Sequence, residues 1–227
     1  MAVYDLEEQE QIDELKTWWK QYGNLVTGGL LAVAVCLAGW QGWSWWQRNE
    51  AFQAGALYAV VERAVGAHDA KKAREAAGEL IDKHAGTSYA GMAALLSARM
   101  QVEAADLKTA KVQLGWALEN ARDVELRDVA RLRLVSVLLD EQGHDEALKL
   151  LASEPALPFA PRHAELKGDV LAAQGKVAEA RAAYQSALNK LDEAQKSAAG
   201  NVQRQGPYRD VLLTKLESQG IPGGMNQ

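Results

Sequence analysis

The sequence predicts an all-α protein in which one N-terminal transmembrane helix is followed by a solenoid of helix pairs. Residues 21–47 contain no Asp, Glu, Lys or Arg. Residues 51–219 are rich in Ala, Leu, Glu, Lys, Gln and Arg, and short turn motifs interrupt them at intervals. Because Val and Ile never alternate with polar residues as in a strand, these observations together favour helix throughout.

The chain divides into four predicted parts. Residues 1–21 form an acidic cytoplasmic tail with an amphipathic helix, and residues 22–47 form the transmembrane helix. Residues 48–219 form the repeat domain, with about four helix pairs and a closing helix, and residues 220–227 form a disordered tail.

Charge is distributed unevenly between these parts. The first twenty residues carry six acids and two lysines, which supply most of the formal net charge of −5. The repeat domain is therefore nearly neutral and lacks the basic stripe that a nucleic-acid-binding domain needs. We expect no nucleic-acid partner.

The predicted transmembrane helix has an apolar centre and aromatic ends. The segment from Leu25 to Trp46 is long enough for a bilayer core of about 30 Å, which requires about 20 apolar residues. Amphipathic aromatic rings prefer the headgroup level, so tryptophans at both ends predict two aromatic belts. Six of the seven tryptophans lie there: Trp18, Trp19, Trp40, Trp43, Trp45 and Trp46.

Three other interpretations of this segment fit less well. A cleavable signal peptide would begin with basic residues and end with small ones, whereas here acids precede the span and bulky rings follow it. A lipoprotein signal ending at Cys36 would need a small residue where Val35 stands. A buried core helix would not explain tryptophans at both ends.

Orientation follows from the basic residues beside the span. Lys16 and Lys20 precede it and Arg48 follows it, which favours a cytoplasmic N-terminus and, in a bacterium, a periplasmic repeat domain. The single cysteine, Cys36, lies within the span, so the repeat domain forms no disulfide.

The repeat is clearest near the C-terminus, in LKGDVLAAQGKVAEARAAYQSAL. Gly168, Gly175, Ala180, Tyr184 and Ala187 have the spacing of helix contacts in a tetratricopeptide repeat. The equivalent alanine recurs at intervals of 37, 37 and 33 residues, at positions 73, 110, 147 and 180. Any Ala-rich bundle gives some such matches, but four pairs would bury a continuous core.

The helix pairs are separated by predicted turns, and a closing helix follows them. The turns lie at residues 66–69, 84–88, 120–123, 142–145, 155–161 and 174–176. Within the second, Ser88 is the expected helix cap. In the closing helix, residues 207–219, we expect Tyr208, Val211, Leu212 and Leu216 to pack on the stack, and Arg209, Asp210, Lys215 and Glu217 to face water.

No catalytic, metal or cofactor site is predicted. The histidines, His68, His84, His144 and His163, have neither each other nor a cysteine at helical ligand spacing. We interpret all four as surface or capping residues. No strand precedes a Gly-rich loop, so a phosphate-binding motif is also missing. The sequence therefore favours a binding protein over an enzyme.

Two sets of residues are candidates for partner contacts. The first helices of stacked pairs line a groove that accepts peptides, and the predicted lining residues are Met92, Leu95, Arg99, Val102, Arg162, Glu165 and Asp169. The alternative is that Leu95 and Val102 are ordinary core residues. Small residues on one face of the span would let a second membrane helix pack closely; these are Gly28, Ala32, Cys36 and Gly39.

The order of these parts resembles that of the YfgM family, the ancillary subunits of the bacterial SecYEG translocon. The resemblance is most specific in the tail EEQEQIDELKTWWKQYG, which leads into the Gly-rich span and the Trp-rich exit. It implies a non-enzymatic, single-pass inner-membrane protein that associates with SecYEG and with the membrane-anchored periplasmic chaperone PpiD, and that assists newly translocated polypeptides. The alternatives are a structural scaffold of another envelope complex and a regulator of an envelope stress response that acts through the tail.

Overall fold

The computed structural model describes residues 4–197 and 206–220, with side chains described for residues 15–196 and 206–220. All regular structure in these ranges is helical, which confirms the predicted fold class. The elements are α1 (Tyr4–Gly66), α2 (Ala70–His84), α3 (Ser88–Glu103), α4 (Leu107–Asn120), α5 (Val124–Asp140), α6 (His144–Leu150), the 3₁₀ helix η1 (Leu157–Phe159), α7 (Ala160–Ala173), α8 (Val177–Ser197) and α9 (Gly206–Ser218). Apart from Gly220, the predicted disordered tail lies outside the described residues.

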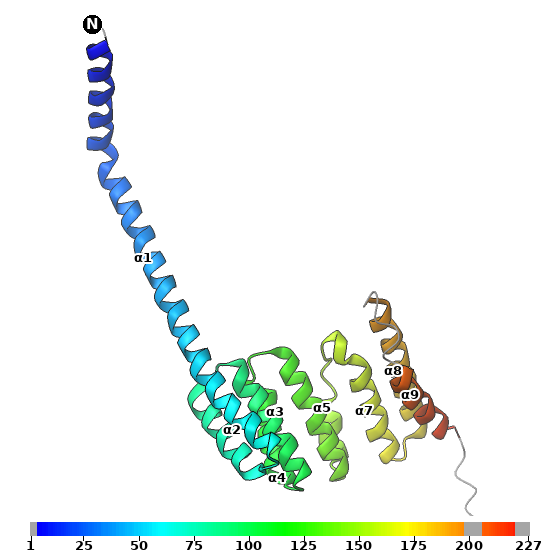
Figure 1. Ribbon diagram of the computed structural model, residues 1–227. Coiled ribbons are helices and arrows are strands. Elements are labelled where there is room, and N and C mark those ends of the chain that lie inside the picture. Colours follow the sequence, from blue (N-terminus) through cyan, green and yellow to red (C-terminus); the bar gives the residue numbers. More distant parts are fainter. Residues whose placement is uncertain (1–3, 198–205, 221–227) are drawn as a thin grey trace, which may run out of the picture. The chain divides into compact units, whose positions relative to one another are not determined.

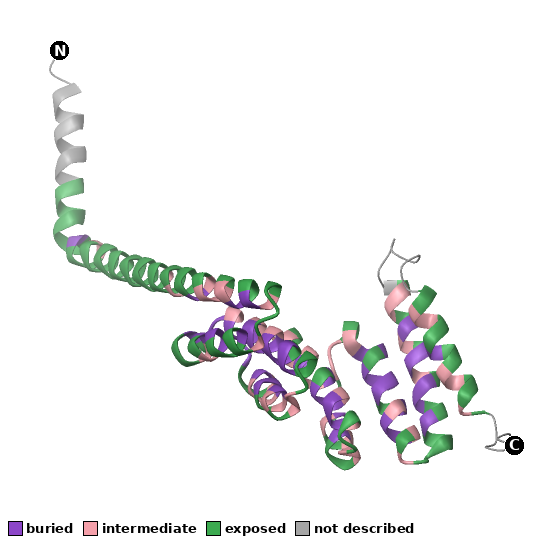
Figure 2. Ribbon diagram, turned by 60° about the horizontal axis from the view of Figure 1, so that its bottom comes forward, coloured by how far each residue is buried: buried purple, intermediate pink, exposed green. Residues whose placement is uncertain are grey.

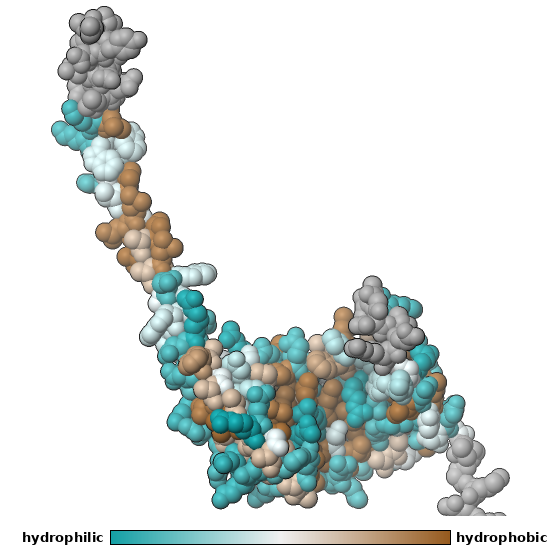
Figure 3. Space-filling model, in the orientation of Figure 1, coloured by the Kyte–Doolittle hydropathy of each residue, from teal (hydrophilic) through white to brown (hydrophobic). Residues whose placement is uncertain are grey.

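The chain divides into two compact units, Met1–Ala51 and Phe52–Gln227. In the described part of the chain, α1 is the one helix long and apolar enough to cross a membrane, and only 6% of its most apolar window is buried. Figure 2 shows this stretch almost wholly exposed, and Figure 3 shows its apolar side chains as a band along the helix. Such exposure is unlike that of a core helix and is typical of a membrane span.

Aromatic rings cluster at each end of the apolar stretch of α1. The ring of Trp18 lies 5.9 Å from that of Tyr22 and 6.4 Å from that of Trp19, and the rings of Trp43 and Trp46 lie 5.6 Å apart. These separations are those of contacting aromatic pairs. Each predicted belt therefore contains aromatic rings that contact one another.

In the second unit, the helices form consecutive pairs. The end of α1 packs on α2 through Val61 and Ala64. Helix α3 pairs with α4, α5 with α6, and α7 with α8, and α9 closes the stack against α8 (Figure 1). The first helices α3, α5 and α7 also contact one another in sequence. A stack of this kind buries one continuous core, and its largest cluster joins side chains of α3, α4, α5, α6 and α7.

The recurring alanine occupies the same place in each second helix. Ala73, Ala110, Ala147 and Ala180 are all fully buried. Each donates its backbone N–H to the carbonyl oxygen four residues earlier, which closes the first turn of its helix. A side chain no larger than a methyl group lets the first helix approach at this point, so the alanine pattern reports a true structural repeat.

The turn inside each pair also repeats. Its central residue has a left-handed backbone, with φ of 54° at His68, 60° at Ala105, 62° at Gln142 and 75° at Gly175. The next residue donates its N–H to the carbonyl five residues earlier, as in a Schellman cap. Only one of these four central residues is glycine. The turn at residues 104–106 contains neither Gly nor Pro, and for that reason it was not predicted.

The third pair departs from the repeat. Helix α6 has seven residues, whereas α4 has 14 and α8 has 21. At a rise of 1.5 Å per residue, α6 is about 10 Å shorter than α4. Residues 151–156 and η1 then lead to α7, so the break begins four residues before the predicted one at residues 155–161.

Candidate functional site

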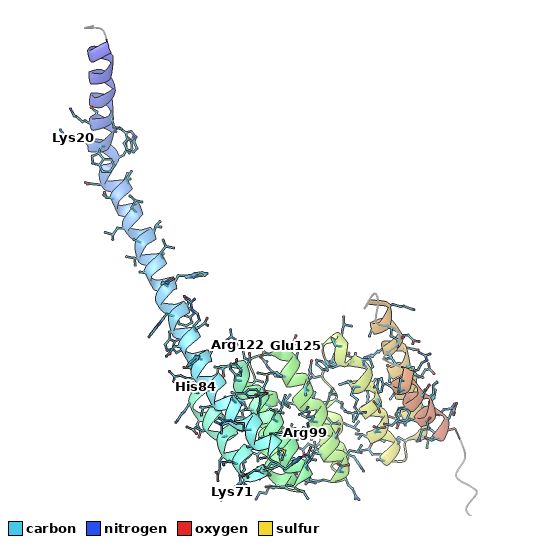
Figure 4. The ribbon with its side chains drawn as sticks, in the orientation of Figure 1. Lys20, Lys71, His84, Arg99, Arg122 and Glu125 are labelled. Atoms are coloured by element: carbon cyan, nitrogen blue, oxygen red, sulfur yellow. The ribbon has the colours of Figure 1, made fainter. Side chains whose placement is uncertain are left out.

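Helix α3 carries the second-pair residues of the predicted groove. Arg99 and Val102 are exposed, Val102 by 38%, and Met92 is partly exposed. Leu95 is only 6% exposed and belongs to the main core cluster, as the alternative interpretation held. Three of these four side chains are therefore accessible to a partner, and Arg99 is labelled in Figure 4.

Arg99 has a second guanidinium group beside it. Arg133 of α5 donates from Nη1 to the backbone oxygen of Leu95 across 3.0 Å. Burial lowers the pKa of Arg133, and the charge of Arg99 lowers it further. Among the described residues no acid lies within ion-pair distance of Arg133, whereas Glu103 accepts from Nε of Arg99 at 2.8 Å. The α3–α5 surface is thus locally cationic.

The sequence alone does not distinguish the surroundings of Arg133 from those of Arg131, two residues earlier. Both lie in the motif RLR at residues 131–133. In the structure only Arg131 is neutralised, by Asp128 at 2.6 Å. Whether each arginine has an acidic partner depends on which face of α5 packs against α3. Counting charges along the chain does not reveal that face.

The fourth-pair residues of the predicted groove instead hold α9 in place. Glu165 is 1% exposed and accepts from Arg162 Nη1 at 2.6 Å, Lys215 Nζ at 2.7 Å and the Tyr208 hydroxyl at 2.8 Å. Asp169 accepts from Lys215 Nζ at 2.7 Å. Because Lys215 and Tyr208 belong to α9, Glu165 and Asp169 serve this internal contact and do not line an open groove.

Hydrogen bonding decides the charge state of Glu165. Burial raises its pKa, but the bonds from Arg162, Lys215 and Tyr208 outweigh burial and hold the pKa below its ordinary value of 4.5. Burial and the same carboxylate raise the pKa of Tyr208. The cluster therefore joins an ionised carboxylate to neutral and cationic donors on two helices.

The closing helix differs in part from its prediction. Leu212 is fully buried, and Tyr208 and Leu216 pack beside it as expected. Val211 is exposed, although we expected it to pack on the stack. The expectation that Arg209 and Lys215 only face water is wrong, because Arg209 pairs with Asp192 and Lys215 with Glu165. Long cationic side chains reach acids on neighbouring helices that a helical-wheel pattern does not include.

The small residues of the span remain available to a membrane partner. Gly28, Ala32, Cys36 and Gly39 are all exposed in the first unit. A Cβ added at Gly28 or Gly39 would meet no atom within 4 Å. Their role in packing against another membrane helix stays a prediction.

The structure also locates the histidines and the cap of α3. In the part of the chain that the structure describes, no group of three or more His, Cys, Asp or Glu side chains is arranged so that it could hold a metal ion. The interpretation of all four histidines as surface or capping residues is wrong for His84 and His163, which are both buried. The cap of α3 is Thr87, whose side chain accepts from the Ala90 amide, rather than the predicted Ser88.

Comparison with known proteins agrees with this architecture over nearly the whole chain. Residues 16–217 match the family model described as a tetratricopeptide repeat-like domain. An ancillary SecYEG translocon subunit of Neisseria gonorrhoeae is 32% identical over 222 residues, which cover 96% of this chain and 99% of the relative. The proteins of the same name from Haemophilus influenzae and Escherichia coli are 31% and 27% identical and cover 82% and 83% of this chain and 90% of each relative. No solved structure matches the chain.

Proposed function

Because this chain belongs to the tetratricopeptide repeat-like family that includes the ancillary SecYEG translocon subunits, we propose that it is a non-enzymatic inner-membrane protein associated with the SecYEG translocon. The observation that carries the proposal is the extent of the similarity, which spans 99% of the Neisseria gonorrhoeae protein. Co-purification of the tagged full chain with SecYEG from solubilised membranes tests it. Recovery of an unrelated envelope complex without SecYEG would favour the alternative of a structural scaffold.

In this proposal the N-terminus is cytoplasmic and the repeat domain is periplasmic. Lys16 and Lys20 before the span and Arg48 after it support this direction. Alkaline phosphatase fused after Gln227 should be active, and the same enzyme fused after Lys20 should be inactive. Activity of the second fusion alone would show the opposite orientation. It would also contradict a periplasmic function of the repeat domain.

The proposed role of the repeat domain is to bind a PpiD-like membrane-anchored chaperone and, through it, to assist newly translocated polypeptides. The accessible and cationic α3–α5 surface, with Met92, Arg99, Val102 and Arg133, supports such binding. Its charge favours an acidic segment of the partner.

A photo-crosslinking residue tests this surface in intact cells. Placed at position 99, it should capture the chaperone, and placed at position 71 on α2 it should not (Figure 4). Lys71 is a matched control because its side chain is also cationic and exposed. Equal capture from both positions would contradict a specific surface. The variant Met92→Ala/Arg99→Ala should weaken co-purification while leaving thermal unfolding of the domain unchanged.

The span is proposed to pack on a membrane helix of the translocon through its small residues. Replacing Gly28 and Ala32 by Leu should reduce recovery of SecYEG. Ala34→Leu adds a bulky side chain on another face of the helix and should not. If both variants recover SecYEG equally, the span is an anchor without a packing role.

A further inference from the structure

A cleft of about 640 Å³ opens on the side of α1 just before the apolar span. Two tryptophan rings and two lysine side chains surround one leucine there, and the five lining residues are Leu15, Lys16, Trp18, Trp19 and Lys20. All five are exposed, and the two rings lie 6.4 Å apart. The volume is within the range of pockets that bind ligands, which is roughly 300–1,000 Å³. Tryptophans at the end of a span lie at the level of the lipid headgroups, so the cleft faces lipid.

Gly23 determines the orientation of one wall of the cleft. The indole of Trp19 lies against this glycine, which is buried although the residues on either side of it in the chain are exposed. A Cβ added at Gly23 would lie 3.2 Å from Cε2 and from Nε1 of the ring, which is too close for an undisturbed contact. With glycine at this position the ring extends along the helix towards the span. It therefore forms an apolar wall that leads from the lysines to the hydrocarbon region.

Two cations lie on the face of α1 that carries Trp19. Lys16 and Lys20 are four residues apart, so they are neighbours on the helix surface, and Trp19 is three residues from Lys16. Among the described residues, Lys20 has no acidic partner (Figure 4). An ammonium group at the level of the headgroups attracts the phosphate of a lipid.

The acidic residues before the cleft determine which phospholipid fits. Asp13 and Glu14 precede Lys16 by no more than three residues of the same helix, or about 5 Å along its axis. The first twenty residues carry six acids and two lysines, and this excess repels a lipid whose only charge is its phosphate. A headgroup with an ammonium group beyond its phosphate would instead meet lysines and acids in the matching order along α1.

The form of that ammonium group is also selected. A primary ammonium has three N–H donors, and charge-assisted hydrogen bonds to carboxylates are stronger than neutral ones. A trimethylated ammonium has the same charge but no donor. The matching lipid is therefore phosphatidylethanolamine, rather than phosphatidylglycerol, which lacks the ammonium, or phosphatidylcholine, which lacks the donors.

We propose that the cleft at residues 15–20 binds one phosphatidylethanolamine molecule. Lys16 and Lys20 hold its phosphate, the rings of Trp18 and Trp19 enclose its glycerol and the start of one acyl chain, and its ammonium group faces the acidic tail. The site requires only that α1 spans a membrane, in either direction and with or without SecYEG.

Native mass spectrometry of the purified full chain in detergent tests the site, because it separates the chain with no lipid from the chain with one or more. The probes are phosphatidylethanolamine, phosphatidylcholine and phosphatidylglycerol with identical acyl chains. The first phosphatidylethanolamine should bind about tenfold more tightly than phosphatidylglycerol and at least about threefold more tightly than phosphatidylcholine, as the loss of hydrogen bonds to charged groups predicts. Equal affinity for the three lipids would overturn the proposal and favour a protein as the occupant of the cleft.

Charge variants assign the preference to the two kinds of group. Lys20→Gln should weaken the first binding of all three lipids by at least about threefold. Arg48→Gln removes the same charge at the other end of the span, where the guanidinium already donates to Ser44, and should not weaken it. Asp13→Asn/Glu14→Gln should reduce the preference for phosphatidylethanolamine over phosphatidylglycerol to less than about threefold. An unchanged preference in this double variant, or equal losses in Lys20→Gln and Arg48→Gln, would contradict the assignment.

Glycine variants test the cleft itself. Gly23→Ala displaces the ring of Trp19 and should weaken the binding of phosphatidylethanolamine. Gly28→Ala is the matched control, because an added Cβ meets nothing within 4 Å there. Equal binding by both variants would contradict the cleft. Because the purified chain is used alone, none of these outcomes depends on association with SecYEG.

Discussion

Gly168 on α7 and Tyr184 on α8 are in such close contact that a Cβ added at Gly168 would lie 2.5 Å from Cε1 of the tyrosine ring. The ring is buried, and its hydroxyl donates to Asp169 Oδ1 across 2.9 Å. Burial and this carboxylate raise the pKa of Tyr184. The ring is fixed at both ends, so it cannot move aside to make room.

Gly168→Ala should therefore lower the free energy of unfolding by about 1–3 kcal/mol, as overpacking of a rigid contact does. Urea unfolding of the full chain, monitored by circular dichroism, should then have a lower midpoint concentration. Gly78→Ala on α2 is the matched control, because an added Cβ meets nothing within 4 Å there. That variant should be neutral or more stable, since Ala favours helix over Gly. Equal loss in both variants would contradict the contact.

Glu165→Gln should destabilise the closing helix. The substitution removes the charge that accepts from Arg162, Lys215 and Tyr208, at a cost of about 2–3 kcal/mol for a charge-assisted network. The first sign of this loss should be faster amide hydrogen exchange in α9. Glu75→Gln, in an exposed pair 4.0 Å from Lys71, should cost less than about 1 kcal/mol. Full protection of α9 in Glu165→Gln would show that Leu212 and its neighbours hold the helix alone.

Stability should depend on pH through His163. Its pKa in the folded state is below the ordinary value of 6.5, mainly because of burial, so the unfolded chain binds the proton more readily. The free energy of unfolding is then greatest above about pH 6.5 and falls as the pH decreases from there towards the folded pKa. Denaturation at pH 7.5 and pH 5.5 measures this difference.

Two variants identify the group responsible. The loss between pH 7.5 and pH 5.5 should be smaller in His163→Phe than in the unmodified chain. It should persist in His68→Gln, because His68 is exposed and Gln142 occupies the equivalent turn of the third pair. An unchanged pH effect in His163→Phe would assign it to another group.

Ala105→Gly should stabilise the protein. Ala105 has a φ of 60°, a left-handed conformation that costs a residue with a Cβ about 1 kcal/mol. Thermal unfolding should therefore occur at a higher temperature in this variant. Gly175→Ala makes the reverse change in the equivalent turn of the fourth pair, where φ is 75°, and should cost a similar amount. The same sign of effect in both variants would contradict the shared turn geometry.

Local patterns predicted most of the fold. The absence of charge in residues 21–47 indicated the apolar stretch of α1. The recurring alanine indicated the second helices, and these alanines are buried as the repeat requires. The turn at Ala105 was missed because its backbone conformation is usually marked by Gly. Here two flanking helices impose it on alanine.

The candidate sites were less predictable because they depend on contacts between distant helices. The position of Glu165 on α7 predicts a residue that lines the groove. In the structure its carboxylate instead accepts a hydrogen bond from Lys215, 50 residues later in the chain. Likewise, His163 has no ligand spacing to any other residue, and only the packing of the helices shows that it is buried. Helical periodicity assigns a residue to a face, but it does not say which later element covers that face.

The abrupt end of α6 also bears on how the stack comes apart. In a linear array each pair is held only by its neighbours, so a shortened helix is a weak coupling between the pairs on either side. We expect α7, α8 and α9 to open as one cooperative unit while α2 to α5 stay folded. Such a breakpoint would let the last pair of the array unfold and refold without loss of the rest of the domain.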